Sequence, residues 1–163
     1  MNPCPCGYLG HPTKKCSCTP RMIQNYRSRI SGPLLDRIDI HLEVPAVDLK
    51  ELSGARPGLS SDQMRAQVQA ARDRQTQRFR GQKGALHANA SMTDQDVNRF
   101  AVLSAPVKSL LDQAMEALQL SARAYTRIRK IARTIADLEA AAEIGPDHIT
   151  EAIGYRTLDR ASG

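Results

Sequence analysis

The first residues whose types could do chemistry are four cysteines near the N-terminus. Cys4-Pro5-Cys6 and Cys16-Ser17-Cys18 form two C-x-C pairs separated by nine residues. Four thiolates this close in the chain suit a tetrahedral zinc ion, which prefers soft ligands and can order a loop too small to have its own core. A site of four cysteines has no open coordination position, so we expect the metal to be structural and not catalytic.

Other interpretations of these cysteines remain open beside the metal. His11 lies between the two pairs and could replace one thiol as a ligand. The thiols could also be free, although four such small residues have no packing reason to gather in one loop. Disulfides are disfavoured because we expect a cytoplasmic chain, whose thiols stay reduced, and because a bridge within a C-x-C pair is strained.

The charge of the chain favours an anionic partner. The formal net charge is +6 and the sequence pI is about 9.4. Early in the chain six cations are opposed only by Asp36: Lys14, Lys15, Arg21, Arg27, Arg29 and Arg37. Nucleic acid, nucleotide phosphate or an acidic protein face would suit this region, and an ordinary solvated surface is the alternative. Aromatic residues are only 4% of the chain, so base stacking on large rings is not expected to dominate.

Several classes of function find no support in the 163 residues. The patterns G-x-x-x-x-G-K-[ST], H-E-x-x-H and G-x-S-x-G do not occur, and the four histidines are scattered. An apolar stretch of about 18 residues, as a membrane span needs, is also missing. The N-terminus lacks the apolar region of a signal peptide. We therefore expect a cytoplasmic binding or structural module with no membrane partner.

Short elements should position the cysteine loop and the basic residues that follow it. Thr19-Pro20 predicts a helix cap followed by a proline at the first helical position, with the helix continuing to about Arg29. The stretch from Ser31 to Arg37 predicts a second short helix. From Ile38 to Val44 apolar and polar residues alternate, which predicts a half-buried strand.

The rest of the chain is predicted to be a helical bundle. Residues 53–61 are rich in turn formers and mark the expected boundary. Ser60 and Gln63 form a capping-box pattern ahead of a long helix, whose apolar face we take to be Met64, Val68, Ala71 and Phe79. Further helices are predicted after Thr93, around Val107 to Leu118, after Ser121 with a stripe from Ala124 to Leu138, and after Gly145-Pro146. These apolar stripes favour a small bundle.

Four motifs occur in a fixed order: NPCPCG, YRSRISGPLLDRID, SARAYTRIRKIARTIADL and EAIGYRTLDR. In these motifs the chain resembles the C-terminal portion of magnesium-chelatase-like AAA+ ATPases of the YifB/ComM type, over nearly its whole length. The resemblance implies a mainly α fold, the C-terminal part of an AAA+ module. Residues 1–52 would be the end of the AAA+ core, with the cysteine cluster, the arginine-finger segment and one or two strands. Residues 53–163 would be the helical lid subdomain.

The resemblance also implies roles for three residues. Asn2 matches the sensor-1 polar residue that orients the attacking water. Arg37 matches the arginine finger that reaches the ATP of a neighbouring subunit, and Arg123 matches sensor 2, which contacts the phosphates from the lid. Each has a plainer alternative: a turn residue for Asn2, a surface pair with a nearby aspartate for Arg37, and one cation of a basic helix face for Arg123.

The family implies a ring-forming, hexamer-type homo-oligomer that uses ATP with magnesium and acts on DNA, with a helicase-like role in recombination and natural transformation. Its members carry Walker A and Walker B segments upstream of the region matched here. We therefore expect this chain to be part of a longer ATPase and not to hydrolyse ATP alone. Two alternatives compete: a self-standing, zinc-stabilised nucleic-acid-binding module, and a helical adaptor that contacts only proteins.

Overall fold

The structure is a computed structural model that describes residues 1–45, 47, 58–82 and 86–156. All regular elements in these ranges are helical, which confirms the mainly α prediction. The chain divides into two compact units, one formed by Met1–Ile38 and Leu42–Pro57 and the other by Asp39–His41 and Gly58–Gly163. None of the described helices combines the length and apolar character that crossing a bilayer requires.

The first unit contains helices α1 (Pro20–Arg27) and α2 (Gly32–Leu35). Helix α1 begins as its sequence predicts, because Thr19 is the N-cap and its side chain accepts a hydrogen bond from the N–H of Met22 at 3.3 Å. Both helices are shorter than predicted. Helix α1 ends two residues before Arg29, and α2 is a single turn within the predicted range from Ser31 to Arg37.

The strand predicted from Ile38 to Val44 is not formed, and this part of the prediction is wrong. Residues 38–45 lie outside any β-ladder, and Ile40, Leu42 and Val44 are exposed. A strand needs a neighbouring strand to pair its backbone groups, and an alternating pattern alone cannot supply one. Within the described residues this stretch finds no such neighbour.

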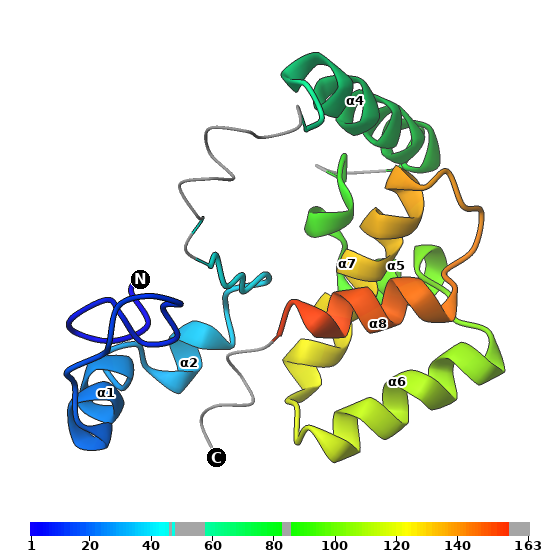
Figure 1. The fold of residues 1–163 in the computed structure, drawn as a ribbon. Helices are drawn as coiled ribbons and strands as arrows, with labels where there is room; N and C mark the ends of the chain where they lie inside the picture. The colour runs from blue at the N-terminus through cyan, green and yellow to red at the C-terminus, as the bar shows by residue number, and fades with distance from the viewer. Residues whose placement is uncertain (46, 48–57, 83–85, 157–163) are drawn as a thin grey trace. The chain divides into compact units, whose positions relative to one another are not determined.

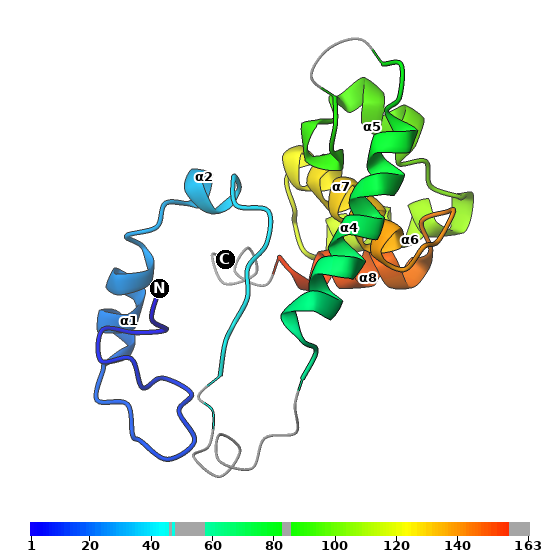
Figure 2. The same cartoon turned by 90° about the horizontal axis from the view of Figure 1, so that it is seen from above.

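The second unit is a helical bundle built around α7 (Ala122–Leu138), as Figures 1 and 2 show. Helices α4 (Ser61–Arg78), α5 (Asp94–Phe100) and α8 (Pro146–Gly154) and the short 3₁₀ helix η1 (Asn89–Ser91) pack on α7, while α6 (Ala105–Ala117) packs on α8. The core holds side chains from most of these elements, including Phe79, Met92, Val97, Leu111, Ile128, Ile135, Ile149 and Ile153.

Helix starts in the bundle follow the predicted caps. Ser60 and Gln63 exchange both bonds of a capping box, at 2.8 and 3.2 Å. Thr93 caps α5 and Ser121 caps α7, each through a side-chain oxygen that accepts a backbone N–H of the first turn. These local signals are confirmed because a cap depends on residues within one turn of the chain.

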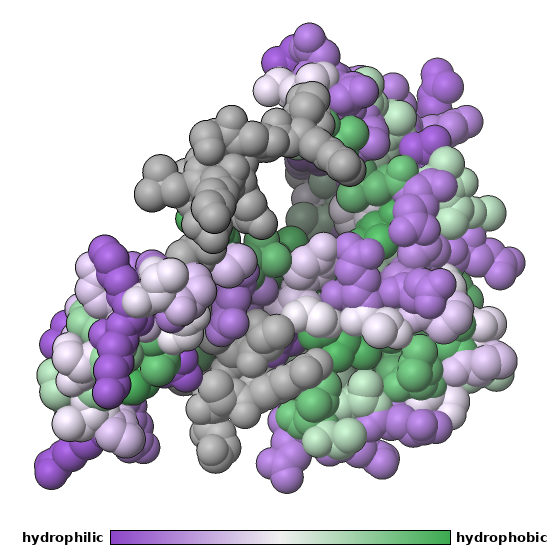
Figure 3. All heavy atoms as spheres, viewed as in Figure 1, coloured by the Kyte–Doolittle hydropathy of each residue, from purple (hydrophilic) through white to green (hydrophobic). Residues whose placement is uncertain are grey.

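The apolar face predicted for α4 is only half correct. Ala71 and Phe79 are buried, but Met64 and Val68 are 47% and 53% exposed. Every residue from 61 to 70 is exposed, so only the second half of α4 packs against the bundle. The surface of α4 is accordingly mostly hydrophilic (Figure 3). Leu138, predicted as part of the buried stripe of α7, is also 45% exposed.

Candidate functional site

The cysteine loop, residues 1–19, is folded by tight turns and held at both ends. The N–H of Gly7 donates to the carbonyl of Cys4 at 3.0 Å, and Gly7 and Gly10 adopt φ of 81° and 78°, a left-handed conformation that glycine adopts without strain. The C-terminal end of the loop runs directly into the cap of α1. Near the start of the loop, the carbonyl of Pro3 accepts a hydrogen bond from Nε of Arg27 on α1 at 3.3 Å.

The four cysteines of this loop come together. The Sγ atom of Cys4 lies 3.4 Å from that of Cys6 and 3.7 Å from that of Cys16. The Sγ atoms of Cys6 and Cys16 are 3.6 Å apart. All four Sγ atoms, with Cys18 included, lie within 4.8 Å of one another. Zinc–sulfur bonds of about 2.3 Å place the sulfurs of a tetrahedral site about 3.8 Å apart. The four thiols can therefore hold a metal ion.

Backbone groups differentiate the thiols. Hydrogen bonds from the backbone of Tyr8 and of Ser17 lower the pKa of Cys6 to about 5. The backbone of Cys6 acts to lower the pKa of Cys18, but burial and the neighbouring thiols outweigh it and raise that pKa to about 12. One thiolate is thus available as a ligand at neutral pH. Others must lose their protons as the metal binds, so binding releases protons.

The alternatives left open for the cysteines can be compared with this geometry. The four cysteines are free thiols in the structure. The group that could hold a metal consists of the cysteines without His11. Instead, Nδ1 of His11 accepts hydrogen bonds from the backbone N–H groups of Thr13 at 3.2 Å and Lys14 at 3.1 Å. His11 therefore shapes the loop and is not one of the clustered ligands.

Two residues with roles implied by the resemblance lie on the first unit. Arg37 is exposed in the turn that follows α2, where its N–H donates to the carbonyl of Leu34 at 3.0 Å. Its Nη1 donates to the carbonyl of Pro33 at 3.1 Å. Asn2 is also exposed, and its side chain lies beside Gly7. The finger and sensor-1 roles remain predictions.

Arg123 belongs to the second unit and is the second residue of α7, immediately after the helix begins. It is exposed. The N-terminal end of a helix carries a partial positive charge, so the guanidinium and the helix end both favour an anion there. The sensor-2 role stays a prediction.

A buried ionic network in the bundle was missed by the sequence analysis. Asp137 of α7 is fully buried and accepts two hydrogen bonds from the guanidinium of Arg78 on α4. It also accepts one from Nδ2 of Asn89 at 2.8 Å and one from Nε of Arg133 at 3.2 Å. The four-residue spacing of Arg133 and Asp137 is a signal for a pair on one helix face. Their own spacing cannot reveal that α4 covers that face.

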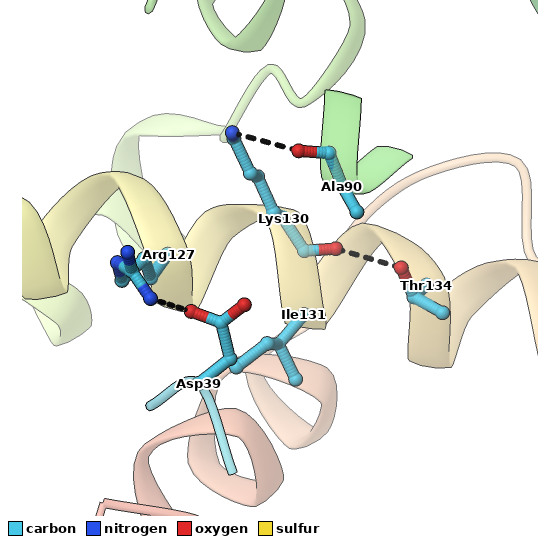
Figure 4. Close-up of a pocket in the computed structure, with 6 residues that line it drawn as sticks. All are labelled: Asp39, Ala90, Arg127, Lys130, Ile131 and Thr134. Carbon is cyan, nitrogen blue, oxygen red and sulfur yellow. Dashed lines mark hydrogen bonds and ion pairs between the residues drawn. The ribbon is translucent and has the colours of Figure 1, made fainter. Parts of the chain in front are cut away.

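A second missed contact involves Asp39, which also belongs to the second unit. Its carboxylate pairs with the guanidinium of Arg127 on α7, beside Lys130 and Ile131 (Figure 4). From the sequence, Asp39 was expected to be a polar residue of the strand or a surface partner for Arg37. Asp39 and Arg127 are 88 positions apart in the sequence, so no local pattern predicts this pair.

Comparison with known proteins places these features in a family. Residues 58–156 match the family model described as the C-terminal part of magnesium chelatase subunit ChlI, and residues 1–52 match the model of magnesium chelatase subunit ChlI itself. The protein YifB of Salmonella typhimurium is 40% identical over 162 residues, which are 98% of this chain and 30% of that protein. The competence protein ComM of Haemophilus influenzae is 38% identical, with the same coverage.

The chain thus spans about 30% of the length of these relatives. One family model covers most of the bundle and the other covers the region of the cysteine loop and Arg37. The chain therefore belongs to the magnesium chelatase ChlI family, in its magnesium-chelatase-like branch with YifB and ComM.

Proposed function

We propose that this chain supplies sensor 1, the arginine finger and the sensor-2 lid of a ring-forming AAA+ ATPase that acts on DNA. The observation that carries the proposal is the order of the two family matches, with the region of Arg37 in one and that of Arg123 in the other. In the complete protein, a hexamer-type homo-oligomer would bind ATP with magnesium. Arg37 would reach the ATP of a neighbouring subunit, while Arg123 would contact phosphates from the lid.

The surroundings of Arg37 suit a finger. A finger must present a permanent cation beyond the surface of its own subunit, and an arginine keeps its charge at any physiological pH. Arg37 is exposed, and its Nη1 contact with the carbonyl of Pro33 orients the side chain through a neutral partner. The planar guanidinium has five N–H donors in a fixed geometry, which suits the oxygens of a transferred phosphate.

Arg37→Ala tests this proposal. The chain is placed in the H. influenzae ComM protein in exchange for the matching 162-residue segment, and ATP turnover and ATP binding are measured. We expect turnover to fall by about a thousandfold or more while ATP affinity changes little, since fingers act on the transition state. Arg72→Ala, at an exposed arginine of α4 outside the proposed binding residues, is the control and should turn over normally. Normal turnover in Arg37→Ala would remove the finger assignment.

We further propose that the metal of the cysteine loop is zinc in a structural role. Four thiolates at tetrahedral spacing are a donor set that zinc prefers. Within the described part of the first unit, Cys4 is the only buried hydrophobic side chain. With so little apolar core, the loop needs another source of folding free energy, and a bound metal provides one. In the complete protein the metal would hold the start of this segment in place.

DNA as the substrate is supported by charge and by one relative. The six cations of residues 1–38 are all exposed, and the same stretch of sequence contains a single acidic residue, Asp36. One relative is named a competence protein. The same charge favours a second candidate function, a zinc-stabilised nucleic-acid-binding module that works without ATP. In that case the 163-residue chain alone would bind DNA with an affinity that falls steeply with salt. ATP turnover of the ComM exchange protein would then not depend on Arg37.

A further inference from the structure

Three residues between α2 and α4, Asp39–His41, belong with the helical bundle. We call them the strap. At one end of the strap the Asp39 carboxylate pairs with Nη1 of Arg127 (Figure 4). At the other end the N–H of His41 donates to the carbonyl of Tyr155, at the C-terminal end of α8, at 2.7 Å. The strap thus contacts both of the helices that form the centre of the bundle.

The contact with α8 completes the helix. The last four carbonyls of a helix lack partners within it, so an outside donor is favourable at this position. The backbone of His41 provides that donor, and its side chain is only 5% exposed. The strap is therefore packed into the bundle as a cap of α8.

The contact with α7 is electrostatic. Asp39 lies in a shallow depression that Arg127 and Lys130 also line, together with Ala90, Ile131 and Thr134 (Figure 4). Nζ of Lys130 donates to the carbonyl of Ala90 at 3.2 Å, which keeps its charge at the rim. A carboxylate is attracted here, whereas a positive side chain at position 39 would be repelled.

Two features of the docked strap weaken its docking. The side chains of Asp39 and Arg127 are 55% and 27% exposed, so solvent weakens their attraction. Both ring nitrogens of His41 are buried and, within the part of the chain that the structure describes, neither has a hydrogen-bond partner, which opposes docking. Reversal of one charge of the Asp39–Arg127 pair should therefore weaken docking of the strap.

We propose that the docked strap fixes the chain that follows Arg37, which makes Asp39 a positioning residue for the arginine finger. This inference rests on the proposed function of Arg37. Only Ile38 separates Arg37 from Asp39 in the chain, so a docked Asp39 limits the space that Arg37 can explore. Arg127 lies one helical turn after Arg123 on α7, so the helix that holds the strap also carries the proposed sensor 2.

Docking is tested on the 163-residue chain by amide hydrogen exchange measured by NMR. We expect the His41 amide to exchange about fivefold faster or more in Asp39→Arg and in Arg127→Asp, because each places like charges together. The double variant Asp39→Arg/Arg127→Asp restores an opposite pair and should return the rate to near that of the wild type. Asp62→Asn, at an exposed ion pair with Arg65 on α4, is the control and should leave His41 unchanged. An unchanged rate in both single variants would refute docking through this pair.

Positioning is tested in the ComM exchange protein described above. In Asp39→Arg we expect kcat to fall at least fivefold while KM for ATP stays within about twofold, with rescue in the double variant. Normal kcat in Asp39→Arg, in a protein that Arg37→Ala inactivates, would refute positioning while leaving the finger in place. Full turnover in Arg37→Ala would instead refute the proposed function and with it the positioning role, whereas the exchange result would still decide whether the strap docks.

Discussion

Replacement of Asp137 by asparagine should destabilise the bundle strongly. This carboxylate is fully buried and joins α7 to α4 through Arg78 and to η1 through Asn89. Asparagine has nearly the same shape, so the change removes the negative charge while creating no cavity. It leaves the guanidiniums of Arg78 and Arg133 next to each other without an anion between them.

The size of the effect follows from burial. Removing one partner of a buried ion pair costs about 3–5 kcal/mol because the remaining charge stays desolvated. The side chain of Arg133 is 5% exposed but that of Arg78 is 18% exposed, so some water can reach the second cation. We therefore expect a loss near the lower end, about 3 kcal/mol. In a chain of this size that corresponds to a decrease in melting temperature of about 6–12 °C.

Acid should reduce the difference between the wild type and this variant. Burial by itself would raise the pKa of Asp137, but the hydrogen bonds from Arg78 and Asn89 and the nearby charges outweigh it and lower the pKa below its usual value. A lowered folded-state pKa contributes stability above the unfolded-state pKa of about 3.9, and that stability is lost as the pH falls through the folded-state pKa. The melting temperatures of wild type and variant should therefore converge below about pH 4.

Thermal unfolding followed by circular dichroism at 222 nm, from pH 7 down to pH 3, measures both effects. Asp62→Asn is the matched control, since this aspartate is 89% exposed, and it should melt within about 1 °C of the wild type. A decrease of less than about 2 °C in Asp137→Asn at pH 7 would refute the reasoning, because the network would then contribute no more than a surface pair. A pH-independent difference would refute the electrostatic origin of the loss.

Two further predictions concern the metal loop and the start of α8. The purified chain should contain about one zinc per molecule by elemental analysis. Cys4→Ser should lose the zinc and Ser17→Ala should keep it. Acid should release the metal, because protons compete with it for the thiolates. A full zinc content in Cys4→Ser would contradict the site. At the start of α8, Nδ1 of His148 accepts the N–H of Gly145 at 2.8 Å, so Nε2 carries the proton and donates to Glu139. His148→Ala should therefore lower the free energy of unfolding by about 1 kcal/mol, measured by thermal unfolding. His148→Gln can accept the same N–H and should lower it less.

Local features were predictable from the sequence because their causes are local. The caps at Thr19, Ser60, Thr93 and Ser121 each depend on a side chain and a backbone N–H three residues later. The gathering of the four cysteines depends on a loop of fifteen residues, from Cys4 to Cys18, and a glycine turn within it. The order of the four motifs is a property of the chain itself, so the family was predictable from the sequence in the same way.

Features that depend on distant partners were not predictable in the same way. Met64 and Val68 have the spacing of a buried face, but burial requires another element to cover it, and only the second half of α4 is covered. The alternation from Ile38 to Val44 indicates a strand, but strand formation requires a neighbour. Within that predicted strand, Asp39 and His41 were taken as the polar face, whereas the structure uses them as the contacts that hold the strap.

The two ends of α7 lead to opposite expectations for its charged residues. Asp137 and Arg133 are buried and hold α4, so their substitution should change the stability of the bundle. Arg123 and Arg127 lie on more accessible positions near the start of the helix, where solvent weakens any contribution to stability. Their charges favour an anionic group, a phosphate for Arg123 by our proposal and the Asp39 carboxylate for Arg127. A substitution at Arg123 that lowered the melting temperature as much as one at Asp137 would argue that this arginine is structural, and the sensor-2 proposal would lose its basis in the fold.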